Sequence, residues 1–520
     1  MNHFASEVFF IMLTCKHLHV ALPEGRVLID DLSFSLNAGD RIGVISEEGN
    51  GKSTLLKILA GDAPDYVSVS GFYSVEGTIA LMYQQIPPVW MQSTPLEFLL
   101  KNDPHNEIEA EDWNRLGVIE KTAARIGLSS DLIYAQRNIA TCSGGEKVKL
   151  QILKLLSRNP DILMLDEPTN DLDLETLEWM ENWLLSLRIP VLFVSHDVKL
   201  LEQCASAILH IEARNKKTKP VSTFFSGSYK DYLEGRQAVR AKTLQVARSD
   251  KREYMAQKQR LNDLHNKVEG KLRTVSRQMP NVAKNLKDKM RSVKSSQAIL
   301  ERSERTQTDS AEEEIQFFLS DASIAPDKIV LDWTDMTIAN DERTLVDAFD
   351  LKIAGRERVL ICGANGSGKS TMIDRMMDDL SQRPDLNVGF MPQDYDRQFA
   401  EFKNAIEFLE QYCEDRNAIT LRLGSLHFQY EEMLQPLDSL SGGQKAKVYL
   451  AALSLQSCTV LVLDEPTRNL SPLSVPVLCQ ALADYNGCVI AVSHDRYFME
   501  HGFTRRLSIE SGRLVDRLMD

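Results

Sequence analysis

Short apolar segments separated by polar and glycine-rich loops recur along the chain and predict the strands and helices of an α/β fold. Residues 28–36 alternate between apolar and polar positions, and residues 41–45 run apolar, as strands do. A glycine-rich loop at 46–54 follows, and the apolar positions of 55–59 predict a helix after it. A strand, a glycine-rich loop and a helix in this order form a phosphate-binding arrangement.

The second half of the chain repeats the series found in the first half. A strand-like run at 162–165 ends in two acidic residues, and a run at 460–463 ends in the same way. Three marker residues of the first half recur 298 positions later: Ser143, Asp166 and His196 correspond to Ser441, Asp464 and His494. Because chance does not keep such a register, the sequence indicates an internal duplication.

Between the two halves the hydrophobic pattern changes to a heptad spacing, which predicts two long helices. Apolar residues recur at intervals of seven on both sides of Pro280: Leu261, Val268 and Val275, with Leu264 between them, and then Leu286, Val293 and Leu300. Proline cannot continue a helix, so we place the reversal near residues 278–281. The pattern predicts an antiparallel helical hairpin with arms of about 40 residues, roughly 60 Å long.

Charge is distributed unevenly and gives this hairpin a candidate role. Residues 236–305 contain nineteen Lys/Arg and seven Asp/Glu, a net charge of +12, whereas the whole chain carries −14. A concentrated basic segment in an acidic protein favours a polyanionic partner. Tyr254 is the one aromatic residue of the segment, so contacts with the phosphates of folded RNA are favoured over base stacking. The alternative is a solvated coiled coil that only spaces the two halves.

Length and composition fit two or three globular domains without a membrane span. The run 8–13, among the longest apolar ones, is far shorter than the ~20 residues that cross a bilayer, and we find no signal peptide. Eight cysteines without a CxxC pair suggest reduced thiols in a cytoplasmic protein. The predicted boundaries are an N-terminal extension at 1–11, a first domain at 12–235, a basic hairpin linker at 236–305 with its tip near 274–285, a polar tether at 306–326 and a second domain at 327–520.

Both halves contain the residues that phosphate-binding loops use to hold a nucleoside triphosphate. Glycines let backbone N–H groups face the phosphates, the helix N-terminus adds a positive dipole, and a lysine reaches the β- and γ-phosphates. The candidate ATP-binding residues of the two loops and of the glutamines that follow them are Ser46, Gly49, Asn50, Gly51, Lys52, Ser53, Thr54 and Gln84, and Gly363, Ala364, Asn365, Gly366, Ser367, Gly368, Lys369, Ser370, Thr371 and Gln393.

Acidic residues at the ends of apolar strands supply candidate metal ligands. A lone carboxylate at the end of a buried strand is costly unless a cation pairs with it, and a Mg²⁺ ion beside the phosphates would do so. A loop serine completes each set. The candidate Mg²⁺ ligands are Ser53 and Asp166 in the first half, and Ser370 and Asp464 in the second.

The residues that follow these strands are candidates for hydrolysis. Glu167 and Glu465 are the candidate general bases for an attacking water. His196 and His494 are candidates to orient that water and to touch the γ-phosphate. The Ser-His-Asp sequence at 195–197 does not form a catalytic triad, because neighbours on a strand point to opposite faces.

The two Ser-Gly-Gly motifs complete the set, and with them both halves resemble the ATP-binding-cassette (ABC) ATPases. In that family the signature of one cassette caps the ATP held by the other. The resemblance therefore adds these ATP contacts: Ser143, Gly144, Gly145, Ser441, Gly442 and Gly443. Two cassettes with a basic helical linker and no membrane segment are similar to the ABC-F proteins, which act on ribosomes. The resemblance implies two P-loop NTPase domains, ATP hydrolysis to ADP and phosphate, and two composite ATP–Mg²⁺ sites within a monomer.

The segment 466–474 resembles the Vga/Lsa-type antibiotic-resistance branch of the ABC-F proteins. The resemblance implies that the linker tip enters the ribosome near the peptidyl-transferase centre and the P-site tRNA and displaces bound antibiotics. The implied contacts with the ribosome and its RNA are Arg273, Arg277, Gln278, Met279, Lys284, Lys287, Lys289 and Arg291. The alternatives are a housekeeping factor for stalled ribosomes, the energising subunit of a membrane importer, and a DNA repair or condensation ATPase.

Departures from the family pattern fall on one of the two composite sites. Ser46 stands where the first loop glycine is expected, and glutamates at 47 and 48 place two negative charges beside the phosphates. In the second half Ser471 replaces the usual aspartate, and the family geometry pairs that segment with the first phosphate loop. The sequence therefore predicts a weaker first site. Neither half shows an aromatic residue to stack on adenine, so the choice between ATP and GTP stays open.

Overall fold

The computed structural model describes residues 11–47, 49–170, 172–213, 219–274, 280–307, 315–319, 322–340, 343–364 and 366–519. It separates into two units. The first, which we call the body, contains residues 1–229 and 315–520 and therefore both halves of the duplication. The second, residues 230–314, is the hairpin unit. In the described ranges, no helix is long and apolar enough to cross a membrane.

A six-stranded sheet with the order β5-β6-β7-β3-β8-β9 forms the centre of the first half. β9 pairs antiparallel with β8, and the other pairs are parallel. β6 is buried at every position, because both faces of such a sheet are covered. The strands of this half are β1 (Ile11–Ala21), β2 (Val27–Asn37), β3 (Arg41–Ser46), β4 (Ser68–Val75), β5 (Ile79–Met82), β6 (Ile162–Asp166), β7 (Val191–Val194), β8 (Ala207–Ala213) and β9 (Lys219–Ser226).

Helices cover this sheet, and one of them carries the phosphate loop. α1 packs between the six-stranded sheet and a three-stranded antiparallel sheet, β2-β1-β4, since Leu56 shares a buried cluster with Leu36 of β2 and Met164 of β6. This packing fixes the loop at the carboxyl end of β3. The helices of this half are α1 (Lys52–Leu59), α2 (Pro95–Leu100), α3 (Ala110–Trp113), α4 (Leu116–Arg125), α5 (Ser130–Ile133), α6 (Gly144–Leu156), α7 (Leu174–Ser186) and α8 (Val198–Cys204).

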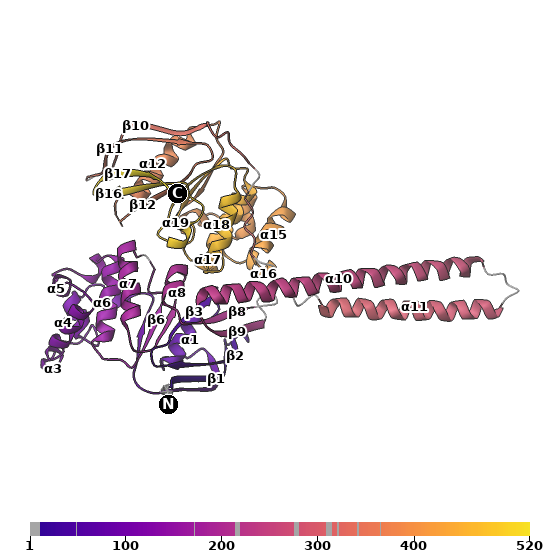
Figure 1. The fold of residues 1–520 in the computed structure, drawn as a ribbon, viewed down its shortest axis with the longest axis horizontal. Coiled ribbons are helices and arrows are strands. Elements are labelled where there is room, and N and C mark those ends of the chain that lie inside the picture. Colours follow the sequence, from indigo (N-terminus) through magenta and orange to yellow (C-terminus); the bar gives the residue numbers. More distant parts are fainter. Residues whose placement is uncertain are drawn as a thin grey trace, which may run out of the picture. The chain divides into compact units, whose positions relative to one another are not determined.

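The second half repeats this architecture with the sheet order β13-β14-β15-β12-β16-β17 and a separate β10-β11 pair (Figure 1). α12 joins the two sheets through a buried cluster that includes Met372 and Met376. The strands of this half are β10 (Ile329–Ala339), β11 (Thr344–Ala354), β12 (Arg358–Gly363), β13 (Val388–Met391), β14 (Val460–Asp464), β15 (Cys488–Val492), β16 (Arg505–Glu510) and β17 (Arg513–Leu518). Its helices are α12 (Lys369–Ser381), α13 (Asp396–Phe399), α14 (Ala405–Glu410), α15 (Arg416–Ser425), α16 (Tyr430–Met433), α17 (Gly442–Leu455), α18 (Val475–Asp484) and α19 (Arg496–Glu500). The predicted α/β fold with two nucleotide-binding domains and a helical hairpin between them is confirmed.

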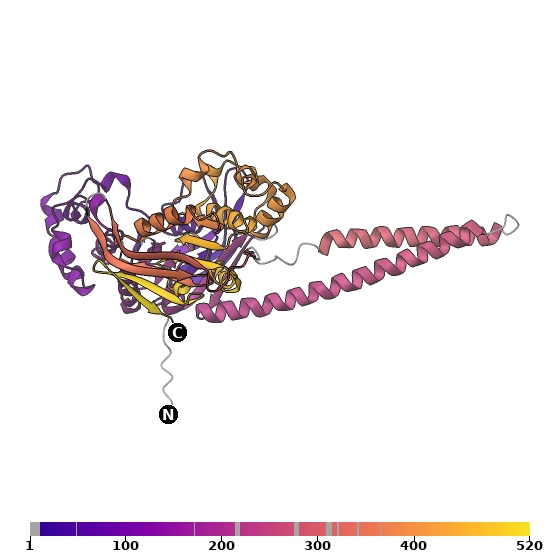
Figure 2. The same cartoon turned by 90° about the horizontal axis from the view of Figure 1, so that it is seen from above.

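The hairpin unit consists of two helices that lie side by side (Figures 1 and 2). α10 (Tyr229–Thr274) begins at the last residue of the body, and α11 (Pro280–Gln307) follows it. Pro280 is the first residue of α11, a position that tolerates proline because its N–H would be unpaired there in any case. The side chain of Gln297 donates to Asn262 Oδ1 at 3.0 Å and joins the two helices.

The heptad positions of this hairpin differ in burial. Val268 of α10 and Val293 of α11 are buried, Leu261 and Leu286 are half-buried, and Leu264 is exposed. Val275 and the side chain of Leu300 lie outside what the structure describes. Tyr254, the aromatic residue of the basic segment, is also buried. Residues 275–279 of the predicted tip lie outside the described residues.

Candidate active site

Each phosphate loop joins the central strand of a sheet to the helix packed beneath it. Gly51, at the N-terminus of α1, has a φ of +87°, and Gly368, at the N-terminus of α12, has a φ of +105°. Side-chain-bearing residues rarely adopt this left-handed conformation, and a Cβ on Gly51 would approach Leu28 Cβ to 3.2 Å. The glycines thus allow the turn that directs backbone N–H groups to one side of the loop.

The predicted bases occupy strained positions at the ends of β6 and β14. Glu167 and Glu465 have φ values of +49° and +53°, although neither is glycine. Their backbone N–H groups donate to Val194 O at 3.0 Å and to Val492 O at 2.9 Å, which holds the strain in place. Because the neighbouring strand fixes the backbone, the Cα atom of each glutamate has a fixed position beside the phosphate loop.

In the first half, Glu167 lies at the centre of a connected polar cluster. Its carboxylate accepts hydrogen bonds from Gln84 and Asn170, each at 2.8 Å. His196 Nε2 lies 3.0 Å from Glu167 Oε1 and 2.8 Å from Lys52 Nζ. Burial alone would raise the pKa of Glu167, but the hydrogen bond and charge of His196 and the charge of Lys52 lower that pKa to about 2.

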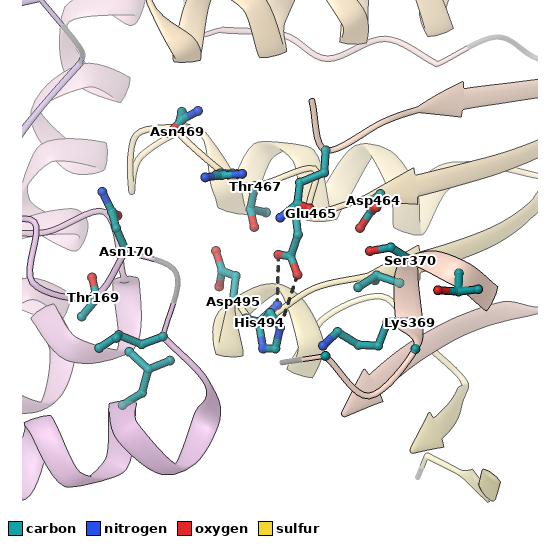
Figure 3. Close-up of a pocket in the computed structure, with 18 of the residues that line it drawn as sticks. Thr169, Asn170, Lys369, Ser370, Asp464, Glu465, Thr467, Asn469, His494 and Asp495 are labelled. Carbon is teal, nitrogen blue, oxygen red and sulfur yellow. Dashed lines mark hydrogen bonds and ion pairs between the residues drawn. The ribbon is translucent and has the colours of Figure 1, made fainter. Parts of the chain in front are cut away.

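In the second half, the corresponding residues surround a cavity of about 590 Å³ (Figure 3). The cavity contains the predicted phosphate, metal and base residues of this half and also residues of the first half. The predicted site residues that line it are Gly366, Gly368, Lys369, Ser370, Thr371, Gln393, Asp464, Glu465, His494 and His196. The two halves therefore enclose this site together, as a composite site requires.

The second site differs from the first in the partners of its lysine and its glutamate. Lys369 Nζ donates to Gly363 O at 2.9 Å and to Ala364 O at 3.0 Å, both in its own loop. Glu465 accepts a hydrogen bond from the backbone N–H of His494 at 3.2 Å. Burial raises the pKa of Glu465 to about 8. A raised pKa makes the ionised carboxylate a stronger proton acceptor.

The two aspartates that end the strands have the environment of cation ligands. Asp166 Oδ1 is buried and has no hydrogen-bond partner, and burial raises the pKa of that carboxyl group. Burial also raises the pKa of Asp464 to about 6. A divalent cation would satisfy both carboxylates, and the hydroxyls of Ser53 and Ser370 supply the hard oxygen donors that Mg²⁺ prefers. The donor set of each loop therefore fits Mg²⁺.

The two signature motifs are helix N-terminal caps. Ser143 Oγ accepts from the backbone N–H of Glu146, and the Glu146 carboxylate accepts from the N–H of Ser143. Ser441 and Gln444 form the same reciprocal pair at the start of α17. This capping box explains why either Glu or Gln is found three residues after the serine. No residue of 143–145 is among the described residues that line the cavity.

The structure adds residues that the sequence analysis did not select. Asn340, Arg343 and Leu345 line the cavity beside the second phosphate loop. Asn170 belongs to the segment after β6, which the sequence analysis did not assign to the site, and it holds the predicted base. A polar residue after an Asp-Glu strand end is a weak signal on its own, because loops are generally polar.

Contacts between the two halves also reach the predicted site residues. His196 Nδ1 lies 2.9 Å from Leu470 O, which belongs to the segment that carries Ser471. Arg496 Nη2 lies 2.6 Å from Glu181 and 3.1 Å from Asp197, and Lys199 lies 2.6 Å from Glu500. These ion pairs join α7 and the N-terminal part of α8 in the first half to α19 in the second.

The predicted RNA contacts are described in part. In the hairpin unit, Arg273, Lys284, Lys287, Lys289 and Arg291 are exposed. Arg273 lies 2.8 Å from Glu269 one turn earlier, an exposed pair that leaves its charge accessible. Arg277, Gln278 and Met279, as well as Asn365 of the second phosphate loop, lie outside the described residues.

Comparison with known proteins identifies the family. A family model described as "ABC transporter" matches residues 29–170 and 346–468, which include both phosphate loops and both strand-end Asp-Glu pairs. The chain belongs to the ABC transporter family. This ABC protein is 28% identical to the ATP-binding protein YdiF of Bacillus subtilis, with 95% of the chain and 79% of YdiF covered. It is 26% identical to ABC transporter F family member 2 of Arabidopsis thaliana, with 95% and 76% covered.

The duplicated cassettes make the chain an ABC ATPase with two nucleotide-binding domains, similar in sequence over most of its length to a member of the F family. In fold, the ABC protein is similar to the archaeal ribosome recycling factor solved with ribosomal stalk protein, with a TM-score of 0.62 at 18% identity. That alignment covers 96% of this chain and 90% of the other. The protein named RNase-L Inhibitor gives a TM-score of 0.61, and that alignment also covers 96% of this chain and 90% of the other. At this identity the likeness shows the shared fold of paired cassettes.

Proposed function

We propose that this ABC protein is an ABC-F ATPase, which acts on the ribosome and uses ATP to insert and withdraw its hairpin. The observation that carries the proposal is the exposed basic surface of α10 and α11, which joins two ATP-hydrolysing halves. A linker that only spaces two domains has no need of a net charge of +12, whereas ribosomal RNA offers a matching polyanion. The structures of similar fold include a ribosome recycling factor, which supports the same partner.

Each composite site would hydrolyse ATP with residues from both halves. Lys52 and Lys369 would bind the β- and γ-phosphates, while Glu167 and Glu465 would accept the proton of the attacking water. His196 and His494 would orient that water. A bound Mg²⁺ ion would neutralise phosphate charge, held by the aspartates and serines named above. The Ser-Gly-Gly motif of the facing half would cap the γ-phosphate.

One hydrogen bond joins the second half to Tyr229, the residue at which the body ends and α10 begins. The hydroxyl of Tyr229, the first residue of α10, donates to Pro472 O at 3.3 Å, and Tyr229 is fully buried. Two residues earlier, Leu470 O contacts His196 of the first site. Closure and opening of the halves would therefore act on the first turn of α10. We propose 12–235 and 327–520 as the two working cassettes and 236–305 as the moving linker.

The resemblance of 466–474 to the Vga/Lsa-type branch supports a finer proposal. The tip would reach the peptidyl-transferase region beside the P-site tRNA and displace lincosamides, streptogramin A compounds or pleuromutilins. The protein would act in the cytoplasm as a monomer. A housekeeping role on stalled ribosomes is the competing outcome, and it predicts a translation phenotype without a change in susceptibility.

Ribosome co-sedimentation tests the proposal. With ATP, a Glu167→Gln, Glu465→Gln double variant should pellet with ribosomes, and with ADP it should remain in the supernatant. The parental chain, which turns ATP over, is the control. Failure to pellet in either nucleotide contradicts the ribosomal role and favours the importer or DNA-repair alternatives. Antibiotic susceptibility with and without the gene then separates resistance from housekeeping.

A further inference from the structure

An ion pair crosses from the first phosphate loop to the facing half. Glu47, the residue after Ser46, places Oε1 3.0 Å from Lys447 Nζ. Lys447 lies on α17, in the second turn after the signature serine Ser441. Its side chain is 9% exposed and that of Glu47 is 31% exposed, so the pair is partly shielded from solvent. This site is the one on which both departures from the family pattern fall.

The other composite site cannot form this pair. The loop position that corresponds to Glu47 is Ala364, which carries no charge. The residue that corresponds to Lys447 is Lys149, on the signature helix α6 of the first half. The ion pair therefore distinguishes the first composite site from the second.

Lys149 and Lys447 also differ in whether an acidic residue of their own half stands at the corresponding position in the segment after the Asp-Glu strand end. In the first half Asp173 caps α7 and lies near Lys149. Burial alone would raise the pKa of Asp173, but hydrogen bonds with Thr176 and the charge of Lys149 lower it. In the second half the corresponding residue is Ser471, whose hydroxyl lies 2.8 Å from that of Ser474. Ser471 carries no charge to attract Lys447, so the lysine is available to Glu47 across the interface.

We propose that Glu47 and Lys447 are a positioning pair that ties the first phosphate loop to the facing signature helix and sets the ATP affinity of that site. The two departures from the family pattern, Glu47 in the first loop and Ser471 in the facing half, then compensate each other. Loss of an aspartate at position 471 leaves Lys447 to neutralise the carboxylate that Glu47 brings beside the phosphates. The inference rests on the first loop being an ATP site.

The two partners should have opposite effects on ATP affinity. Glu47→Gln removes a negative charge from beside the triphosphate, so the first site should bind ATP more tightly, by about threefold to tenfold. Lys447→Met removes the cation that lies 3.0 Å from Glu47, so affinity should fall by a similar factor. In the Glu47→Gln background, Lys447→Met should have little further effect. Lys447→Arg keeps the charge and should retain parental affinity.

ATP titration of variants that carry Lys369→Met measures the first site alone, because that change disables the second loop. Glu500→Gln, which breaks a different ion pair between the halves, is the control and should leave this affinity within about twofold. If Glu47→Gln and Lys447→Met lower ATP affinity equally, or if their effects on affinity add in the double variant, the proposal is overturned. No ATP binding in the Lys369→Met parent overturns the site assignment instead.

Zero-length carbodiimide cross-linking tests the contact without any substitution. In the nucleotide-free chain, mass spectrometry should find the peptides of Glu47 and Lys447 joined, together with those of Lys199 and Glu500 as an internal positive control. Formation of the control cross-link without the Glu47–Lys447 product, in the absence of nucleotide and with ADP, overturns the proposal.

Discussion

At the scale of single residues, two glutamates with the same sequence context have different surroundings. Glu167 is held by Gln84 and Asn170 and lies 3.6 Å from the ammonium group of Lys52. Lys369, the lysine of the second loop, instead bonds to loop carbonyls, and among the described residues no ion pair joins Lys369 to Glu465. A triphosphate that binds the first loop must therefore draw Lys52 away from His196 and Glu167 as well as from the carbonyl of Ser46, whereas Lys369 leaves carbonyls of its own loop.

The first prediction concerns the bases. Changing both Glu167 and Glu465 to Gln should lower ATP turnover by about 100-fold or more, because the amides cannot accept the proton of water. ATP binding should remain, since lysines, serines and aspartates are unchanged. Steady-state phosphate release and ATP titration measure the two quantities. Parental turnover in the double variant would show that other residues serve as bases.

The second prediction concerns the inequality of the sites. Glu465→Gln should cost more turnover than Glu167→Gln, because the first loop carries Ser46 and Glu47 and its lysine is engaged internally. Phosphate release by the two single variants decides the order. Equal losses, or a larger loss from Glu167→Gln, would contradict this ranking.

At the scale of elements, the sequence predicted the motifs that recur in both halves. It did not predict the contacts that form only when distant segments of the fold come together. The loop–helix and strand-end motifs are local, so their residues could be assigned from register with the duplication. The cavity residues Asn340 and Arg343 follow β10, far from any motif, and only the fold brings them to the site. Likewise, Glu47 was recognised as an unfavourable charge, but its partner lies on the facing half.

The hairpin shows the same limit of sequence patterns. Heptad spacing correctly selected Val268 and Val293 as buried, yet it also selected Leu264, which is exposed. A heptad gives the spacing of a seam but not its width, because the supercoil and the partner helix decide which neighbours of the seam are covered.

A third prediction follows for the hairpin. Val268→Ala or Val293→Ala removes about two buried methylene equivalents and should destabilise the pairing of α10 and α11 by about 1.5 kcal/mol. Hydrogen exchange of the full chain should then be faster in both helices. Val239→Ala is the matched control, since Val239 is 68% exposed on α10. Unchanged exchange in the buried variants would show that the valines do not hold the helices together.

At the scale of the whole molecule, charge separates the two units. The body is acidic, and the basic residues of 236–305 are presented on helices with few buried side chains. Such a hairpin contributes little to folding of the body, so its charge is free to serve binding. A polyanion that binds it should release counterions, and the salt dependence of binding then reports how many phosphates the basic side chains neutralise.

The last prediction uses this salt dependence. Reversing Lys284, Lys287, Lys289 and Arg291 to Glu should weaken ribosome binding and flatten its dependence on salt, by about 0.7–0.9 in logarithmic slope for each phosphate that is no longer neutralised. A charge-preserving variant, with the three lysines changed to Arg and Arg291 to Lys, should keep the parental slope. Substitutions at Gln278, Met279 or Asn281 remove no charge, so they should spare binding and change only the translation or susceptibility phenotype. Each of the three sets of substitutions is made in the Glu167→Gln, Glu465→Gln background, and its ribosome binding is measured by pelleting across a salt series. ATP binding of each variant reports whether the body is intact. If charge reversal leaves the salt curve of a nucleotide-competent chain unchanged, the hairpin is a spacer and RNA contacts the body instead.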